Sequence, residues 1–85
     1  MNYRLVLIEW ADAYGVSADW VPLPVAAQEH RIHSVGWLVA KSDAAVCLVP
    51  HLSLGGQASE SPAAACGDMV IPRSAIRSMV ELRSE

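Results

Sequence analysis

The chain has 85 residues, of which 53% are hydrophobic, and this length and composition favour one small domain with its own core. Its net charge of −3 argues against a protein that binds duplex nucleic acid, because such proteins carry a basic surface. No apolar run reaches the roughly 18 residues of a membrane span, and the N-terminus lacks the features of a signal peptide, so we expect no membrane association and a cytoplasmic location.

The first predicted element is a strand over residues 3–10. Val6 and Ile8 point to one face of this strand, whereas Leu5 and Leu7 point to the other. A strand that is apolar on both faces is typical of a small barrel, or of a sheet whose second face is covered by a partner.

Residues 11–30 are predicted to form a long loop. Ser17 can begin one helical turn, but Pro22 and Pro24 prevent a longer helix because proline lacks the backbone N–H. Loops of this length in compact domains are commonly functional. We expect the side chain of Trp20 to pin the loop to the core.

Residues 31–41 are predicted to form the central strand of a curved sheet. Apolar residues occupy both of its faces, and Gly36 lies in its interior. A glycine inside a strand often marks a bend or a close approach of another backbone. The short connection 42–44 leads to a strand over residues 45–51, and the two strands should form a hairpin.

The second half of the chain is less regular. Residues 52–67 have the glycine-rich composition of a loop. A strand over 68–72 ends at a proline, and one helical turn over 72–76 should follow. The remaining residues, 77–82, are predicted to form a last strand, although the spacing of the apolar residues also fits a helix.

This order of elements resembles the Src-homology-3-like small barrel. The resemblance implies an all-β domain over residues 1–85, with five strands closed into a barrel and a one-turn helix before the last strand. Peptide-binding members of that family carry an aromatic residue where this chain has Ala75, and they carry a tryptophan pair that this chain lacks. We therefore do not expect the usual binding of proline-rich peptides.

A second resemblance, closer in residues, is to short accessory proteins of tailed bacteriophages. The segments that carry it are Ile8-Glu9-Trp10-Ala11-Asp12-Ala13, Ser34-Val35-Gly36-Trp37-Leu38-Val39, Val49-Pro50, and Ile71-Pro72 with Ile76. The resemblance implies a protein that acts in the cytoplasm of the infected host cell by binding a host component or a signal.

Five residues are candidates for a binding surface. The rings of Tyr14, Trp20 and Trp37 can stack on a base or pack against a partner. Arg73 and Arg77 can hold a phosphate. Because the chain has no phenylalanine, its tryptophans are also expected to supply core volume.

A zinc site is an alternative for the histidines and cysteines. His30, His33, Cys47 and His51 offer the nitrogen and sulfur ligands that zinc prefers, but their spacing lies outside the usual structural patterns. A cysteine in an apolar strand, such as Cys47, is commonly a small core residue. We expect both cysteines, Cys66 included, to be reduced thiols.

No catalytic pattern is present in the sequence. Cys47 or Ser34 is a conceivable nucleophile with a histidine and Asp12, but no nucleophile elbow or Cys-His signature surrounds either. Gly55-Gly56 lacks the Gly-Lys-Ser/Thr ending of a phosphate loop. We therefore expect neither enzymatic activity nor a cofactor.

The leading hypothesis is a non-enzymatic, homo-oligomeric binding module that engages and inhibits a host protein, for example one of the host defence. An exposed sheet edge or the loop 11–30 would make the contact. Two alternatives stay open: an oligomer that sequesters a nucleotide signal, and a structural domain held together by zinc.

Overall fold

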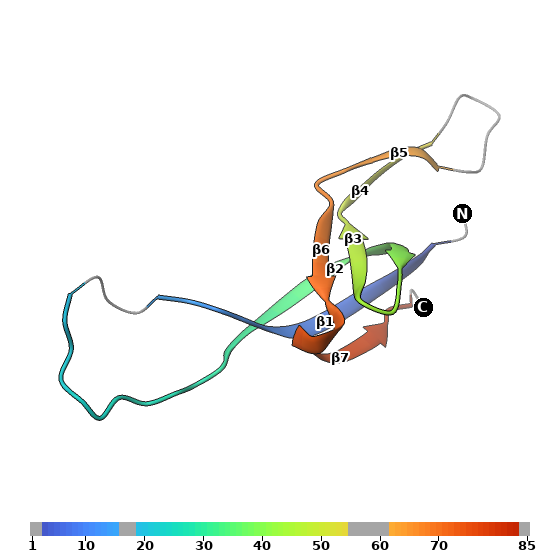
Figure 1. Ribbon diagram of the computed structural model, residues 1–85. Coiled ribbons are helices and arrows are strands. Elements are labelled where there is room, and N and C mark those ends of the chain that lie inside the picture. Colours follow the sequence, from blue (N-terminus) through green and yellow to red (C-terminus); the bar gives the residue numbers. More distant parts are fainter. Residues whose placement is uncertain (1–2, 16–18, 55–61, 84–85) are drawn as a thin grey trace.

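The computed structural model describes residues 3–15, 19–54 and 62–83, and it is all-β apart from one short 3-10 helix. The elements in chain order are β1 (Arg4–Asp12), β2 (His30–Lys41), β3 (Ala45–Val49), β4 (His51–Leu54), β5 (Pro62–Cys66), β6 (Met69–Pro72), the 3-10 helix η1 (Arg73–Ala75) and β7 (Ile76–Glu81) (Figure 1). The all-β class and the one-turn helix before the last strand are confirmed. The end of the chain is a strand, not the alternative helix.

Five strands form one antiparallel sheet in the order β6-β3-β2-β1-β7. The predicted closed barrel is wrong, because β6 and β7 are the two edges of this sheet and do not pair with each other. All four residues of β6 are used in its ladder with β3, and the chain passes directly from β6 into η1. After β6 the chain therefore turns towards β1, and no ladder forms between β6 and β7.

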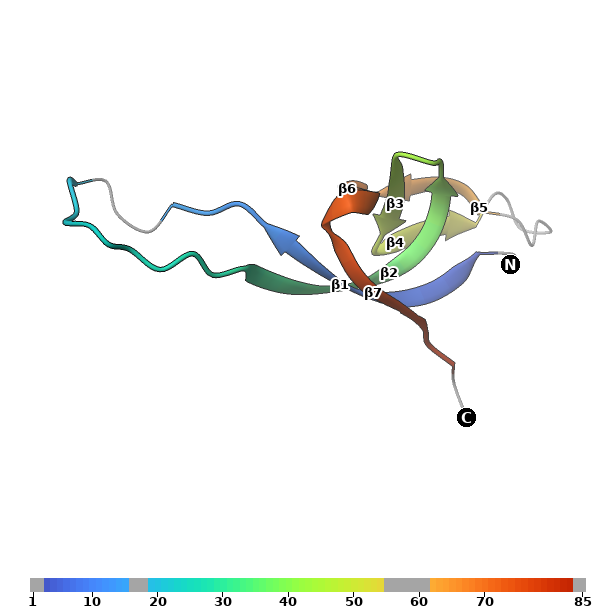
Figure 2. The ribbon, with the colours of Figure 1, turned by 60° about the horizontal axis from the view of Figure 1, so that its bottom comes forward.

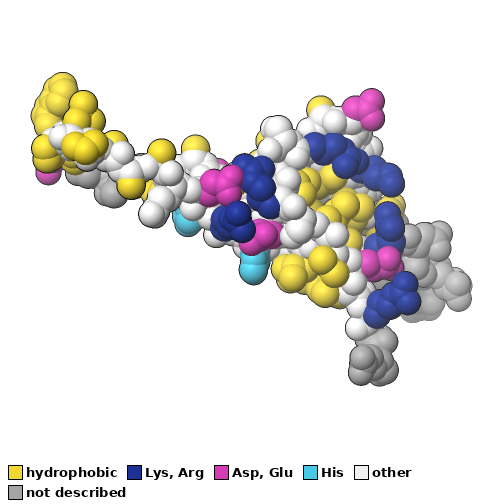
Figure 3. All heavy atoms as spheres, turned by 90° about the horizontal axis from the view of Figure 1, so that it is seen from below, with side chains coloured by type: hydrophobic (Ala, Val, Ile, Leu, Met, Phe, Trp, Pro, Cys, Tyr) yellow, Lys and Arg dark blue, Asp and Glu magenta, His cyan; other side chains and the backbone are white. Residues whose placement is uncertain are grey.

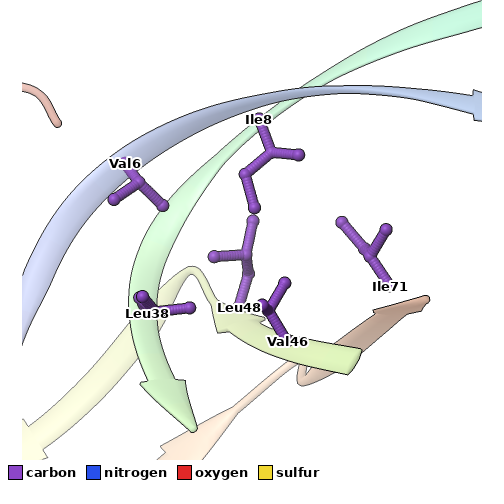
Figure 4. Packing of buried hydrophobic residues seen from close by; sticks show 6 residues of the cluster. All are labelled: Val6, Ile8, Leu38, Val46, Leu48 and Ile71. Carbon is purple, nitrogen blue, oxygen red and sulfur yellow. The ribbon is translucent and has the colours of Figure 1, made fainter. Parts of the chain in front are cut away.

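The core lies on the concave face of the curled sheet (Figure 4). Its members are buried aliphatic side chains from four strands: Val6, Ile8, Leu38, Val46, Leu48 and Ile71. Side chains alternate between the two faces of a strand, so the cluster takes alternate residues from the middle of β1 and from β3. Trp10 packs against the cluster, as expected, and its Nε1 donates a hydrogen bond to Ser34 Oγ at 3.0 Å.

Gly36 is buried in β2 where the backbone of β3 approaches closely. A Cβ atom at this position would lie 2.9 Å from the carbonyl oxygen of Val49. The close approach predicted from the glycine is confirmed.

The predicted loop 52–67 is wrong in part, because β4 and β5 form a separate two-stranded antiparallel sheet. Two features hide this hairpin from the sequence. Pro50 is a stop signal in the sequence but only separates β3 from β4. The strand β5 is built from proline, alanine and cysteine, and proline and alanine are depleted in strands. The glycine-rich residues 55–61, Gly55-Gly56 among them, lie outside the described residues, as does the helical turn expected at Ser17.

The molecule is elongated, with principal extents of 62 × 27 × 25 Å and a radius of gyration of 17.2 Å. A compact chain of this length has a radius of gyration of about 12 Å. The additional length comes from the long connection between β1 and β2, which projects away from the sheet (Figures 1 and 2). The described part of the chain contains no helix with the length and apolar character needed to cross a membrane.

Candidate functional site

The most prominent feature outside the sheet is the connection 13–29, which we call the arm. It grows out of a two-stranded stem, because the β1–β7 ladder ends at Trp10 whereas β1 and β2 stay paired as far as Asp12 and His30. Beyond residue 10, the end of β1 and the start of β2 thus have only each other as ladder partners. The stem carries the arm clear of the core (Figure 2).

The apolar side chains of the arm face solvent. Trp20 and Leu23 are 102% and 83% exposed, and Val21 and Val25 are also exposed. The expectation that Trp20 pins the loop to the core is therefore wrong. The reason lies in the stem, which carries residue 20 away from the sheet, and in the two prolines, which cannot join a helix or a central strand that would fold the arm back.

Charged groups fasten the root of the arm, which is the part next to the stem, to the sheet. Glu29 accepts hydrogen bonds from Arg77, at 2.6 Å from Nη2 and 2.8 Å from Nε, and from Arg31 Nε at 3.2 Å. The hydrogen bond from Arg77 is the main cause that lowers the pKa of Glu29 below its usual value. Arg77 also donates from Nη1 to the backbone oxygen of Ser74 at 3.0 Å, which ties the root to η1.

Tyr14 fastens the other side of the root. Its hydroxyl donates to the backbone oxygen of Gln28 at 3.1 Å, and its ring meets the His30 ring edge-on with centroids 4.9 Å apart. The two segments of the arm, one that follows β1 and one that precedes β2, are thus held together where they leave the stem.

The five candidate binding residues do not form one site. Tyr14 and Arg77 both hold the root, and Trp20 belongs to the arm with its side chain in solvent. Trp37 lies in β2, and Arg73 Nε donates to the backbone oxygen of Ser42 at 2.5 Å. Only Tyr14 and Arg77 lie in the same part of the fold, and both are engaged there by Gln28 and Glu29.

A second apolar surface lies on the convex side of the sheet, where the sequence already placed apolar residues on the second face of both β1 and β2. We call it the outer face. In β1 its members are Leu5 and Leu7, which point away from the core residues of that strand. Each is flanked by an apolar residue on either side, so the outer face consists of two rows. One row is Val80 of β7, Leu7 and Val35 of β2, and the other is Leu82 just after β7, Leu5 and Trp37 of β2.

One surface hollow of about 310 Å³ combines an aromatic ring with basic groups. It is lined by Tyr3, Arg4 and Lys41 together with the β2 residues between Leu38 and Ala40. None of the five residues predicted from the sequence lines it. The signal that was missed is the position of Tyr3 and Arg4 at the start of β1, next to the end of its partner strand.

The zinc ligands considered above are not brought together. Among the described residues, no three His, Cys, Asp or Glu side chains lie close enough to hold a metal ion. Cys47 and Cys66 are free thiols.

Comparison with protein-family models, with curated proteins and with solved structures found no match to this chain.

Proposed function

We propose that the protein is a non-enzymatic binding module whose arm inserts into an apolar groove of another protein, and that in an infected cell this is a host protein whose action is blocked. The observation that carries the proposal is the row of exposed apolar side chains on an arm with a fastened root. Burying a tryptophan side chain removes about 150–250 Å² of surface from water, and the part of this hydrophobic gain that exceeds the entropy cost of association appears as affinity.

The chemistry of the arm defines the groove that suits it. Trp20-Val21-Pro22-Leu23-Pro24 is apolar throughout, and residues 13–28 contain Asp19 but neither lysine nor arginine. Proline-rich extended segments dock into grooves lined by aromatic side chains, and they lose little conformational entropy when they bind. The groove of the partner should therefore be lined by aromatic side chains and not by acidic ones.

The test replaces Trp20 with a photo-crosslinking amino acid in the full chain. Irradiation in host lysate should yield one dominant adduct, and the same probe at Lys41, which lies at the far end of β2, should not yield it. The adduct protein is then purified and its affinity is measured directly. Trp20→Ala combined with Leu23→Ala should weaken binding at least 100-fold, since anchor residues of this kind contribute about 2 kcal/mol or more each.

Two results would contradict the proposal. One is a probe at position 20 that captures nothing, or only a second copy of this chain. The other is a purified partner that binds the double variant as tightly as it binds the unaltered protein.

A second candidate function, sequestration of a nucleotide signal, is favoured by the hollow at Tyr3, Arg4 and Lys41. Its volume is at the lower end of the range for small-molecule sites. A nucleotide at 100 times its Kd stabilises the folded state by about 2.7 kcal/mol. A thermal-shift screen against a nucleotide panel should show this stabilisation, and Arg4→Ala with Lys41→Ala should abolish it; the absence of any shift counts against the function.

A further inference from the structure

A continuous line of charged groups joins the root of the arm to the sheet. Both carboxylate oxygens of Glu29 are used: Oε1 accepts from Nη2 and Nε of Arg77, at 2.6 and 2.8 Å, and Oε2 accepts from Nε of Arg31 at 3.2 Å. Arg31, in β2, continues the line to Glu9 of β1 at 3.4 Å. Arg77, in β7, continues it to the backbone oxygen of Ser74 in η1 at 3.0 Å. Figure 3 shows acidic and basic side chains together where the arm leaves the sheet.

A bulge in the β1–β7 ladder makes Arg77 available for this contact. Glu9 pairs with Ser78, and the next residue of β1, Trp10, pairs with Ile76, so that Arg77 is an extra residue of β7 without a partner in β1. In a regular ladder Arg77 would lie opposite Trp10, on the face that holds the core, because paired residues share one face. The bulge gives that place to Ile76, which packs against the core cluster. Bulges commonly re-aim a side chain in this way, and here the re-aimed guanidinium reaches the root.

The contact between Arg77 and Glu29 is suited to setting a direction more than to stabilising the fold. Exposed ion pairs contribute little to stability, and these two side chains are 36% and 40% exposed. An arginine that donates from two nitrogens nevertheless restricts the orientation of a carboxylate more than a single contact does. Beyond residue 10 the stem has only two strands, and a two-stranded ribbon is marginally stable by itself. The direction of the arm therefore depends on what ties its root to the rest of the sheet.

We propose that Glu29 and Arg77 are positioning residues that hold the arm at one fixed angle to the sheet. The exposed side chains of Trp20 and Leu23 then meet a partner in a preset orientation. A segment that is already held in its bound orientation loses less freedom on association, which leaves more of the contact energy as affinity. This benefit rests on the proposed function of the arm, whereas the fixed angle itself does not.

The test measures the distance between the arm and the sheet in the full chain by double electron–electron resonance. Spin labels are attached at Leu23→Cys and Val80→Cys, two exposed positions, after the free thiols of Cys47 and Cys66 have been replaced by alanine. This labelled protein should give one narrow distance distribution. Arg77→Gln should broaden the distribution about twofold or more, because a two-stranded stem without this tie is free to swing. Glu29→Ala breaks the same contact from the side of the arm and should broaden it to the same extent.

Two control variants in the same labelled protein make the result specific. Arg73→Gln removes an arginine that donates to Ser42 instead of the root, and it should leave the distribution narrow. Trp20→Ala removes an apolar side chain of the arm but no contact of the root, and it should also leave the distribution narrow. Circular dichroism checks that each variant keeps its fold.

Three results would overturn the proposal: a broad distribution in the labelled protein itself, a distribution that stays narrow in both Arg77→Gln and Glu29→Ala, or an equal broadening in Arg73→Gln. None of these results bears on the proposed function, which depends on the protein that the probe at position 20 captures.

Discussion

Gly36 lies where the backbones of β2 and β3 come closest, and no larger residue fits there without movement. The atom that an added methyl group would meet is the Val49 carbonyl oxygen, which belongs to the backbone and cannot rotate away. This one contact lets β3 lie across the curled part of β2 and so shapes the concave face that holds the core.

We therefore expect Gly36→Ala to destabilise the protein by about 1–3 kcal/mol, the usual cost of overpacking a tight site. The matched control is Gly15→Ala, because a Cβ atom there meets nothing within 4 Å. Chemical denaturation of the two variants checks the prediction, and equal midpoints would show that the close approach is not a constraint.

Glu29 makes the stability of the arm root dependent on pH. Its pKa is lowered in the folded state, chiefly by the hydrogen bond from Arg77, so the folded state favours the carboxylate. The stabilisation is present above the usual glutamate pKa of about 4.3 and is lost as the pH falls through the lowered value.

The measurement compares urea unfolding of the unaltered protein and of Glu29→Gln between pH 6 and pH 3. The unaltered protein should be the more stable at pH 6, and the difference should shrink below pH 4.3 or so as Glu29 becomes protonated. A stability difference between the two proteins that stays constant from pH 6 to pH 3 would mean that the ion pairs of Glu29 contribute nothing to the free energy of unfolding.

At the scale of elements, the arm and the sheet differ in what their apolar residues do. Those of the sheet alternate with the strand period and build a core, whereas those of the arm contact no described part of that core. The prolines that exclude a helix here were evident in the sequence. The sequence did not show whether the loop folds back or projects, because that depends on where the β1–β7 ladder stops.

Removal of the arm side chains should therefore leave the fold unaffected. We expect Trp20→Ala with Leu23→Ala to change the free energy of unfolding by no more than about 0.5 kcal/mol, as for other exposed positions. Ile8→Ala, in the centre of the core, is the contrasting variant and should lower the free energy of unfolding by about 2–5 kcal/mol. Thermal or urea unfolding distinguishes them, and a large loss in the arm variant would show that Trp20 packs on the domain.

At the scale of the whole molecule, the hydrophobic core is small. Only seven hydrophobic residues are buried among those that the structure describes. A chain of 85 residues has a thin stability margin even when it is compact.

The sequence predicts a homo-oligomer, and the stability of an oligomer depends on protein concentration. If the folded protein is a dimer, mass action raises the thermal midpoint as protein concentration increases. We expect a clear rise between 1 and 100 μM for the unaltered protein. Scanning calorimetry over that range checks it, and a midpoint independent of concentration would contradict a dimer.

The sequence by itself determined the all-β class, the β2–β3 hairpin, the role of Gly36 and the single helical turn before the last strand. These follow from local rules: alternation of apolar residues, the absent N–H of proline and the absent side chain of glycine. Only the tertiary structure decided that the sheet stays open, that Trp20 projects into solvent and that Leu7 lies between Val35 and Val80. Those features depend on which strands pair and in which register, and ladders between residues far apart in the chain leave no local pattern that could reveal them.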